Sequence, residues 1–162
     1  MEQFHKERIT RSLGIDVYAM CIDRCPEAMD LGSKIAKDRG LSAKVNFMRK
    51  RLGRGGYYRD TVKYDVVITQ GILDYLSYER AISLLESAWL ISNHGGAIVT
   101  SNMNWHKWMR FWMEFFGGWR LKYRRRDELS AIMKKSGYKD VNVYLLPEGY
   151  HWIGTGKKNP IG

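Results

Sequence analysis

Short apolar runs alternate with longer stretches of helical spacing along most of the chain. Apolar runs at 16–23, 43–48 and 64–73 predict strands, and the third is continuous enough to be buried on both faces of a sheet. Apolar residues at helical spacing predict one helix from Pro26 to Gly40 and another from Ser77 to Ile91. The expected buried faces are Ala28, Leu31, Ile35 and Ala36 in the first, and Ala81, Leu84, Leu85 and Ala88 in the second.

The remaining patterns extend the same alternation to both ends of the chain. Residues 2–12 predict a short helix ended by Gly14, and the sequence NHGG at 93–96 should stop the helix before it. A fourth strand is expected at 97–102, and a helix at 127–136 with Asp127 as its cap. Residues 140–146 and 151–157 should close the fold as an antiparallel pair. The order predicts an α/β domain over 1–162, with a mostly parallel sheet and helices on both faces.

Composition is that of an ordinary globular protein. The chain has 162 residues, 44% of them hydrophobic and 27% charged, and a domain of this size buries about 68 to 70% of its unfolded surface. No apolar run approaches the roughly 18 residues of a membrane span, so we expect no transmembrane segment. The N-terminus is polar, unlike a secretory signal, and we expect the cytoplasm, with Cys21 and Cys25 as reduced thiols.

Positive charge is in excess and unevenly spread. Twenty-seven Lys and Arg against seventeen Asp and Glu give +10, and basic residues gather at 49–59, at 120–126 and at Lys157 and Lys158. Such loops could contact the phosphates of a nucleic acid, with tyrosines for stacking, or be solvated surface. Both readings stay open at this point.

The carboxyl ends of the predicted strands carry the candidate chemistry, because ligands bind there in open α/β sheets. These ends lie at Asp23, at Met48, at Gln70 with Gly71, and at Asn102. An acid after a strand often accepts hydrogen bonds from a ribose, but the glycine-rich turn that precedes it in dinucleotide sites is missing. Asp23 could instead be a carboxylate that favours the dipole of the following helix.

Three stretches resemble the class I S-adenosylmethionine-dependent methyltransferases. Residues 17–41 resemble that family's second strand, its acid and the next helix. Residues 64–102 resemble its fourth strand, the helix behind it and its fifth strand, with His94 where proline is usual in the turn. Residues 127–144 resemble the last helix and strand, so that the resemblance runs from about residue 14 to residue 158.

The resemblance implies a Rossmann-like methyltransferase sheet with an antiparallel C-terminal strand pair, S-adenosylmethionine as cofactor, and a methyl acceptor that the sequence does not identify. Asp23 would bind the ribose, Gly71 would lie near the amino acid part of the cofactor unless it is a simple turn glycine, and His106 would be a general base unless it is a surface histidine. Asp74 would cap the following helix. The implied cofactor contacts are Asp23, Arg24, Met48, Arg49, Gln70, Gly71 and Ile72, the catalytic candidates His106 and Tyr75, and the substrate contacts Asn102, Asn104 and Trp105.

The chain also departs from the family. The family begins with a strand that runs into a glycine-rich loop, and this chain starts after both, although the strand would lie between those ending at Asp23 and Gln70. Either these two strands pair directly, a partner fills the gap, or the sequence is a truncated form, which we favour. We therefore expect weak or absent cofactor binding by residues 1–162, and a noncatalytic partner-docking subunit is an alternative. Where the family often offers an acid or amide to the adenine, this chain has Met48 and Arg49.

Residues 104–119 form an unusually aromatic stretch. If helical, they carry a wide apolar stripe with a narrow polar remainder. Such a surface could be a lid or core element, a homo-oligomer contact through 105–119, or an interfacial membrane helix. The stripe consists of Trp105, Trp108, Trp112, Phe115 and Trp119, widened by Met109, Met113 and Phe116.

Overall fold

The computed structural model describes residues 15–49 and 62–160. The helix predicted at 2–12 and most of the basic loop at 49–59 lie outside the described residues. The chain divides into two compact units, an N-terminal unit of residues 1–52 and a C-terminal unit of residues 53–162. Each unit is described by itself, and one domain over 1–162 stays a prediction.

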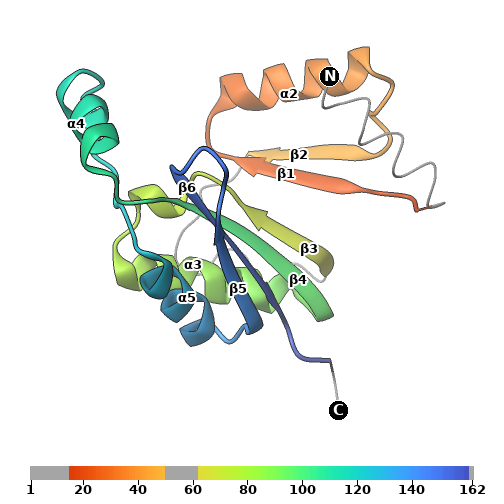
Figure 1. The fold of residues 1–162 in the computed structure, drawn as a ribbon. Coiled ribbons are helices and arrows are strands. Elements are labelled where there is room, and N and C mark those ends of the chain that lie inside the picture. The colour runs from red at the N-terminus through yellow and green to blue at the C-terminus, as the bar shows by residue number, and fades with distance from the viewer. Residues whose placement is uncertain (1–14, 50–61, 161–162) are drawn as a thin grey trace. The chain divides into compact units, whose positions relative to one another are not determined.

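The N-terminal unit is a strand, a helix and a second strand, as the apolar pattern predicted (Figure 1). Strand β1 (Ala19–Asp23) pairs in parallel with β2 (Val45–Arg49), and Asp23 lies opposite Arg49 at their shared carboxyl ends. Helix α2 (Pro26–Asp38) connects them, with proline in its first turn. The parallel pair confirms the predicted βαβ connection.

Helix α2 buries a different face from the expected one. Ala36 is buried, but Leu31 and Ile35 are 60% and 43% exposed. A glycine decides the orientation, since a Cβ built on Gly32 would lie 2.6 Å from the Phe47 ring. The helix therefore approaches β2 through Gly32. The predicted burial is confirmed for Ala36 and was wrong for Ala28, Leu31 and Ile35.

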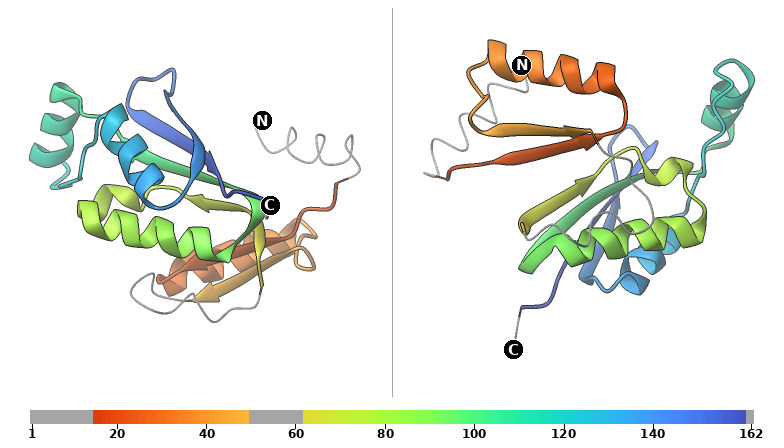
Figure 2. Two further views of the ribbon diagram at one scale, coloured as in Figure 1. Left: turned by 90° about the horizontal axis from the view of Figure 1, so that it is seen from below. Right: turned by 180° about the vertical axis from the view of Figure 1, so that it is seen from behind.

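The C-terminal unit is built on a four-stranded sheet in the order β3-β4-β6-β5. Strands β3 (Tyr64–Thr69) and β4 (Ser92–Met103) are parallel, whereas β6 (His151–Lys157) runs antiparallel to both β4 and β5 (Lys139–Leu145). This confirms the closing antiparallel pair. Figure 2 shows the same sheet from two further sides.

Helices α3 (Tyr78–Ile91) and α5 (Arg126–Lys135) pack on one face of this sheet, together with the short 3₁₀ helix η1 (Leu73–Tyr75). Gly154 in β6 allows the close approach, because a Cβ there would lie 2.5 Å from Met133 Sδ in α5. The opposite face carries Val66 and Ile68 of β3, which are 51% and 66% exposed. Among the described residues of this unit, α3, α5 and η1 thus cover one face, and helices on both faces of the whole sheet stay a prediction. The core consists of Leu73, Ala81, Leu85, Ala88, Ile98, Leu129, Ile132, Met133, Tyr138 and Val143.

Two helix caps differ from the sequence prediction. Ser77 caps α3, and its Oγ accepts a hydrogen bond from the Arg80 N–H at 3.4 Å, whereas Asp74 lies inside η1. Helix α5 has Arg125 at its N-cap position, so Asp127 belongs to its first turn and was wrongly expected as the cap.

Helix α3 ends at Ile91, as expected before NHGG. Strand β4, however, already begins at Ser92 and not at residue 97. Residues 93–96 form an irregular part of this strand, where its register with β3 shifts and Gly95 has a φ of +77°.

The described strands form two separate sheets. β1 pairs with β2 in the N-terminal unit, and β3 pairs with β4 in the C-terminal unit. The three alternatives for the strands that end at Asp23 and Gln70 stay predictions. No described helix has the length and apolar character needed to cross a bilayer.

Candidate functional site

In the N-terminal unit, Asp23 ends β1 and its side chain is exposed. One carboxylate oxygen, Oδ1, accepts the backbone N–H of Cys25 at 2.9 Å. This bond fixes the turn between β1 and α2. Because a carboxylate has about four lone-pair positions on two oxygens, a single local bond leaves it able to accept ribose hydroxyls.

The other candidates of this unit lie at the same end of the strand pair. Met48 is opposite Ile22 and Arg49 is opposite Asp23, and Arg24 follows Asp23 in an exposed bend. The structure thus brings Asp23, Arg24, Met48 and Arg49 together at one edge. Glu27 lies beside them, and the Cys25 Sγ that donates to its Oε2 at 3.0 Å lowers the pKa of its carboxyl.

In the C-terminal unit, the loop after β3 carries Gln70, Gly71 and Ile72. Gly71 has a φ of +69°, a conformation that glycine adopts without strain, and its N–H donates to Ser101 Oγ at 3.1 Å. Apart from its two chain neighbours, none of the described residues has an atom within 4 Å of a Cβ built on Gly71. The backbone at this residue is therefore open to a ligand, whereas Gln70 is exposed and Ile72 half-buried beside it.

The catalytic candidates lie on segments that follow the two parallel strands. Tyr75 is 53% exposed in η1, after β3. His106 follows β4, is exposed, and makes an edge-to-face contact with Tyr150 at 5.7 Å between ring centroids. Because β3 and β4 are parallel neighbours, both segments begin at the same end of the sheet, where the carboxyl ends of the two strands lie.

A buried polar network lies at this carboxyl-terminal end of the sheet. Asp74 Oδ1 accepts the Met103 N–H at 2.6 Å and the Asn102 side-chain amide at 2.9 Å. Arg124 donates to Asn102 Oδ1, to the Leu73 carbonyl at 2.7 Å and to the Leu76 carbonyl at 2.6 Å. The network ties η1, β4 and the segment before α5 into one rigid corner.

Burial shifts the pKa values of this network. Desolvation raises the pKa of Asp74, although the Met103 N–H, His151 and Arg124 act in the opposite direction. Desolvation also lowers the pKa of Arg124. Both directions have the same cause, because a buried charge loses its hydration.

The three substrate candidates differ in exposure. Asn102 is fully buried, and its amide donates to Asp74, Lys122 and Met103, which favours a structural role over a substrate contact. Asn104 is half-buried between Gly149 and Trp152, with its Oδ1 accepting the Trp152 indole N–H at 3.0 Å. Trp105 is the exposed member of the set.

Several residues of the basic clusters make hydrogen bonds within the fold. Lys158 is buried, and its Nζ donates to the Trp89 carbonyl at 2.9 Å and to the Ser92 carbonyl at 3.0 Å. Arg124 belongs to the buried network, and Arg126 Nε donates to the Val143 carbonyl at 3.0 Å. These contacts weaken the nucleic-acid reading, whose other basic loop lies largely outside the described residues.

Sequence reasoning missed the role of Asp74 and Arg124. Asp74 has the sequence context of a helix cap, and Arg124 is one of five basic residues in RLKYRRR. The burial of one arginine in such a run has no local signal, because it depends on carbonyls contributed by Leu73 and Leu76.

Solved structures share this fold, whereas no protein-family model and no curated protein matches the sequence. The "possible exported protein" of Bordetella parapertussis superposes with a TM-score of 0.76 at 19% identity, over 88% of this chain and 54% of that one. The S-adenosylmethionine-dependent methyltransferase SibL gives 0.72 at 18% identity, over 88% and 43%. Magnesium protoporphyrin IX methyltransferase from Synechocystis, solved with bound SAH, gives 0.65 at 14% identity, over 88% and 64%.

The chain therefore has the Rossmann-like fold of S-adenosylmethionine-dependent methyltransferases. It spans between 43% and 64% of the length of these three structures.

Proposed function

We propose that this chain is part of an enzyme that transfers the methyl group of S-adenosylmethionine to an acceptor nucleophile. The observation that carries the proposal is the methyltransferase fold over 88% of the chain, shared with a structure solved with bound SAH. Two local features support it. Asp23 ends a parallel strand with carboxylate positions to spare, and Gly71, in the loop after another parallel strand, has open space beside its backbone.

The roles are proposed for each unit separately. In the N-terminal unit, Asp23 accepts hydrogen bonds from the ribose hydroxyls, while Arg24, Met48 and Arg49 line the same strand ends. In the C-terminal unit, Gln70, Gly71 and Ile72 contact the amino acid part of the cofactor. Charge-assisted bonds of this kind contribute roughly 1.5 to 3 kcal/mol each.

When bound, the cofactor would supply a methyl group on a positively charged sulfur, which would pass to a lone pair of the acceptor while the electron pair of the broken carbon–sulfur bond stays on sulfur. The protein holds the acceptor in line, excludes water and takes the acceptor's proton, and orientation alone supplies about 7 to 11 kcal/mol in well-aligned reactions. We assign proton removal to His106 or Tyr75 and acceptor contacts to Asn104 and Trp105.

We further propose that cofactor binding by residues 1–162 is weak, because no glycine-rich loop follows a strand before Asp23. In the family that this chain resembles, such a loop follows a first strand. That strand and loop would come from a longer form of the chain or from a partner.

Saturation-transfer difference NMR with S-adenosylmethionine tests the proposal, because it detects weak binding. We expect ribose proton signals with the wild-type chain, their loss in Asp23→Ala, and their retention in Asp30→Ala, which removes an exposed carboxylate from α2. Absence of signal with the wild-type chain, or equal signals in the wild type and Asp23→Ala, would contradict the assignment.

A further inference from the structure

Helix α4 (Lys107–Phe115) and the residue after it carry five exposed aromatic rings. Phe111 stacks on Phe115 at 5.2 Å and Trp112 stacks on Phe116 at 4.5 Å between ring centroids. Four of the rings thus form one continuous surface, which we call the aromatic ridge. It consists of Phe111, Trp112, Phe115 and Phe116, which are between 48% and 70% exposed. The fifth ring, Trp108, is 66% exposed.

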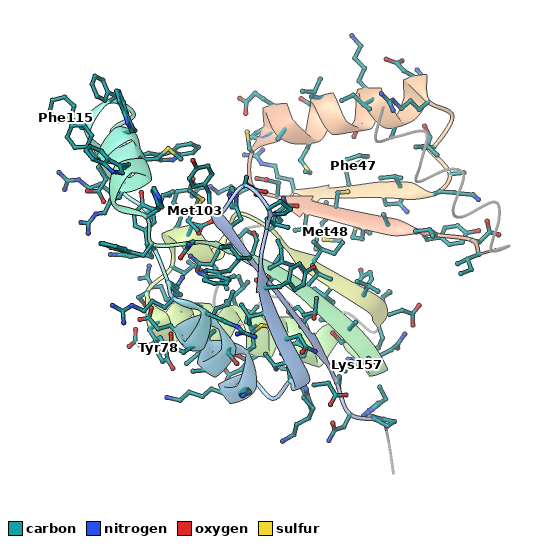
Figure 3. The ribbon with its side chains drawn as sticks, in the orientation of Figure 1. Phe47, Met48, Tyr78, Met103, Phe115 and Lys157 are labelled. Carbon is teal, nitrogen blue, oxygen red and sulfur yellow. The ribbon has the colours of Figure 1, made fainter. Side chains whose placement is uncertain are left out.

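The ridge projects from the C-terminal unit. Helix α4 follows the carboxyl end of β4, and its ribbon stands apart from those of α3 and α5 (Figure 1). Figure 3 shows Phe115 near the far end of this helix, among side chains directed away from the sheet. The ridge therefore presents exposed aromatic side chains on a helix that projects from the unit.

Positive charge is in excess in the segment that carries the ridge. Residues 104–126 contain seven Lys and Arg, of which Arg124 is buried, and one acid, Glu114, which forms an ion pair with Arg110 at 3.0 Å. Arg120 and Lys122, which follow the ridge in the sequence, are exposed. A surface that covers the ridge and this following segment therefore meets an excess of positive charge.

The positive charge indicates which kind of partner binds the ridge. The chain's net charge of +10 disfavours self-association, because like charges repel. An anionic lipid surface complements this charge. Tryptophan and phenylalanine beside lysine and arginine are also the residues that suit the headgroup boundary of a bilayer.

We propose that α4 docks this protein on the surface of an anionic phospholipid membrane. The aromatic ridge lies in the headgroup region, with the helix axis in the membrane plane. Arg120 and Lys122 contact lipid phosphates. This docking is independent of the proposed methyl transfer.

Co-sedimentation with vesicles tests the proposal. The full chain should bind vesicles of phosphatidylcholine mixed with phosphatidylglycerol, bind pure phosphatidylcholine far less, and be released by salt. Arg120→Gln with Lys122→Gln should weaken binding on the order of 30-fold, taking about fivefold for each charge near the surface. The matched control, Lys134→Gln with Lys139→Gln, removes two exposed charges elsewhere and should bind like the wild type.

The ridge itself is tested by Trp112→Ala with Phe115→Ala, which should lower vesicle binding by about tenfold or more. Both side chains are exposed, so the circular dichroism spectrum and melting temperature should not change, and Tyr144→Ala on β5 is a control for loss of an exposed ring. Failure of the wild type to bind the mixed vesicles would overturn the proposal. So would binding that needs Arg120 and Lys122 but not the ridge, or a dimer abolished by the ridge substitutions without vesicle binding.

Discussion

The side-chain amide of Asn102 donates to the buried Asp74 carboxylate at 2.9 Å, and the same oxygen, Oδ1, accepts the Met103 N–H at 2.6 Å. This pair joins the segment after β3 to the end of β4. Gly71 and His106 follow the carboxyl ends of the neighbouring strands β3 and β4. The hydrogen-bonded pair of Asp74 and Asn102 therefore fixes the base of the candidate site. It is a positioning feature, because Asn102 is fully buried.

Asp74 should make stability depend on pH. Burial raises the pKa of its carboxyl in the folded state, so folding favours the protonated form. The stabilisation is present below the unfolded pKa of about 3.9 and is lost as the pH rises through the raised folded pKa. Asp74→Asn keeps the acceptor oxygen and lacks this titration. The free energy of unfolding of Asp74→Asn minus that of the wild type should therefore increase with pH across this window.

Urea denaturation at a series of pH values from about 3 to 7 measures this difference. A difference that does not change with pH would contradict a raised pKa of the Asp74 carboxyl. A difference that decreases with pH would mean that Arg124 stabilises the carboxylate by more than burial destabilises it.

Arg124→Met should strongly destabilise the C-terminal unit. The substitution leaves the carbonyls of Leu73 and Leu76 and the Asn102 side-chain oxygen without this donor. Unsatisfied buried acceptors cost about 1 to 3 kcal/mol each, so a loss of roughly 3 kcal/mol or more is expected. Arg120→Met, an exposed arginine of the same run, should change stability by less than about 0.5 kcal/mol. Chemical denaturation that gives equal losses for both would contradict the buried network.

Gly71→Ala should be destabilising for a backbone reason. The φ of +69° costs a residue with a Cβ roughly 1 to 2 kcal/mol, while the space around it is open. Gly71→Asn should lose less, because asparagine tolerates the left-handed region. Thermal unfolding of the two variants measures the difference, and equal stability of Gly71→Ala and wild type would show that the turn adopts another conformation.

Two lysines should stabilise the C-terminal end of α3 unequally. Lys158 Nζ donates to the Trp89 and Ser92 carbonyls, and exposed Lys63 Nζ donates to the Leu90 carbonyl at 2.7 Å. Lys158→Met should cost about 1 to 3 kcal/mol, because it leaves buried carbonyls unpaired, and Lys63→Met less than about 1 kcal/mol. Denaturant midpoints check the order, and a larger loss for Lys63→Met would contradict it.

The order of strands and helices along the chain was predictable, because apolar runs and helical spacing depend directly on local structure. The parallel pair β3 and β4 and the antiparallel pair β5 and β6 were expected from such runs. The orientation of α2 was not, because Gly32 rather than the larger apolar residues meets Phe47. The extension of β4 to Ser92 was missed as well, since NHGG has the composition of a turn.

The candidate site was less predictable than the fold. The strand-end positions of Asp23 and Gly71 follow from the topology. The burial of Asn102 and Arg124 does not, because both depend on partners distant in sequence. Polar residues after a strand can equally bind a ligand or support the corner beneath it.

Amide chemical-shift mapping with S-adenosylhomocysteine tests the central claim most directly. At millimolar ligand we predict chemical-shift changes at Asp23 and Arg24 in the N-terminal unit and at Gln70, Gly71 and Ile72 in the C-terminal unit. We also predict an affinity too weak to be measured by calorimetry at micromolar concentrations. Shifts confined to the basic segment 120–126, or no shifts at the solubility limit of the ligand, would contradict a methyltransferase cofactor site in this chain.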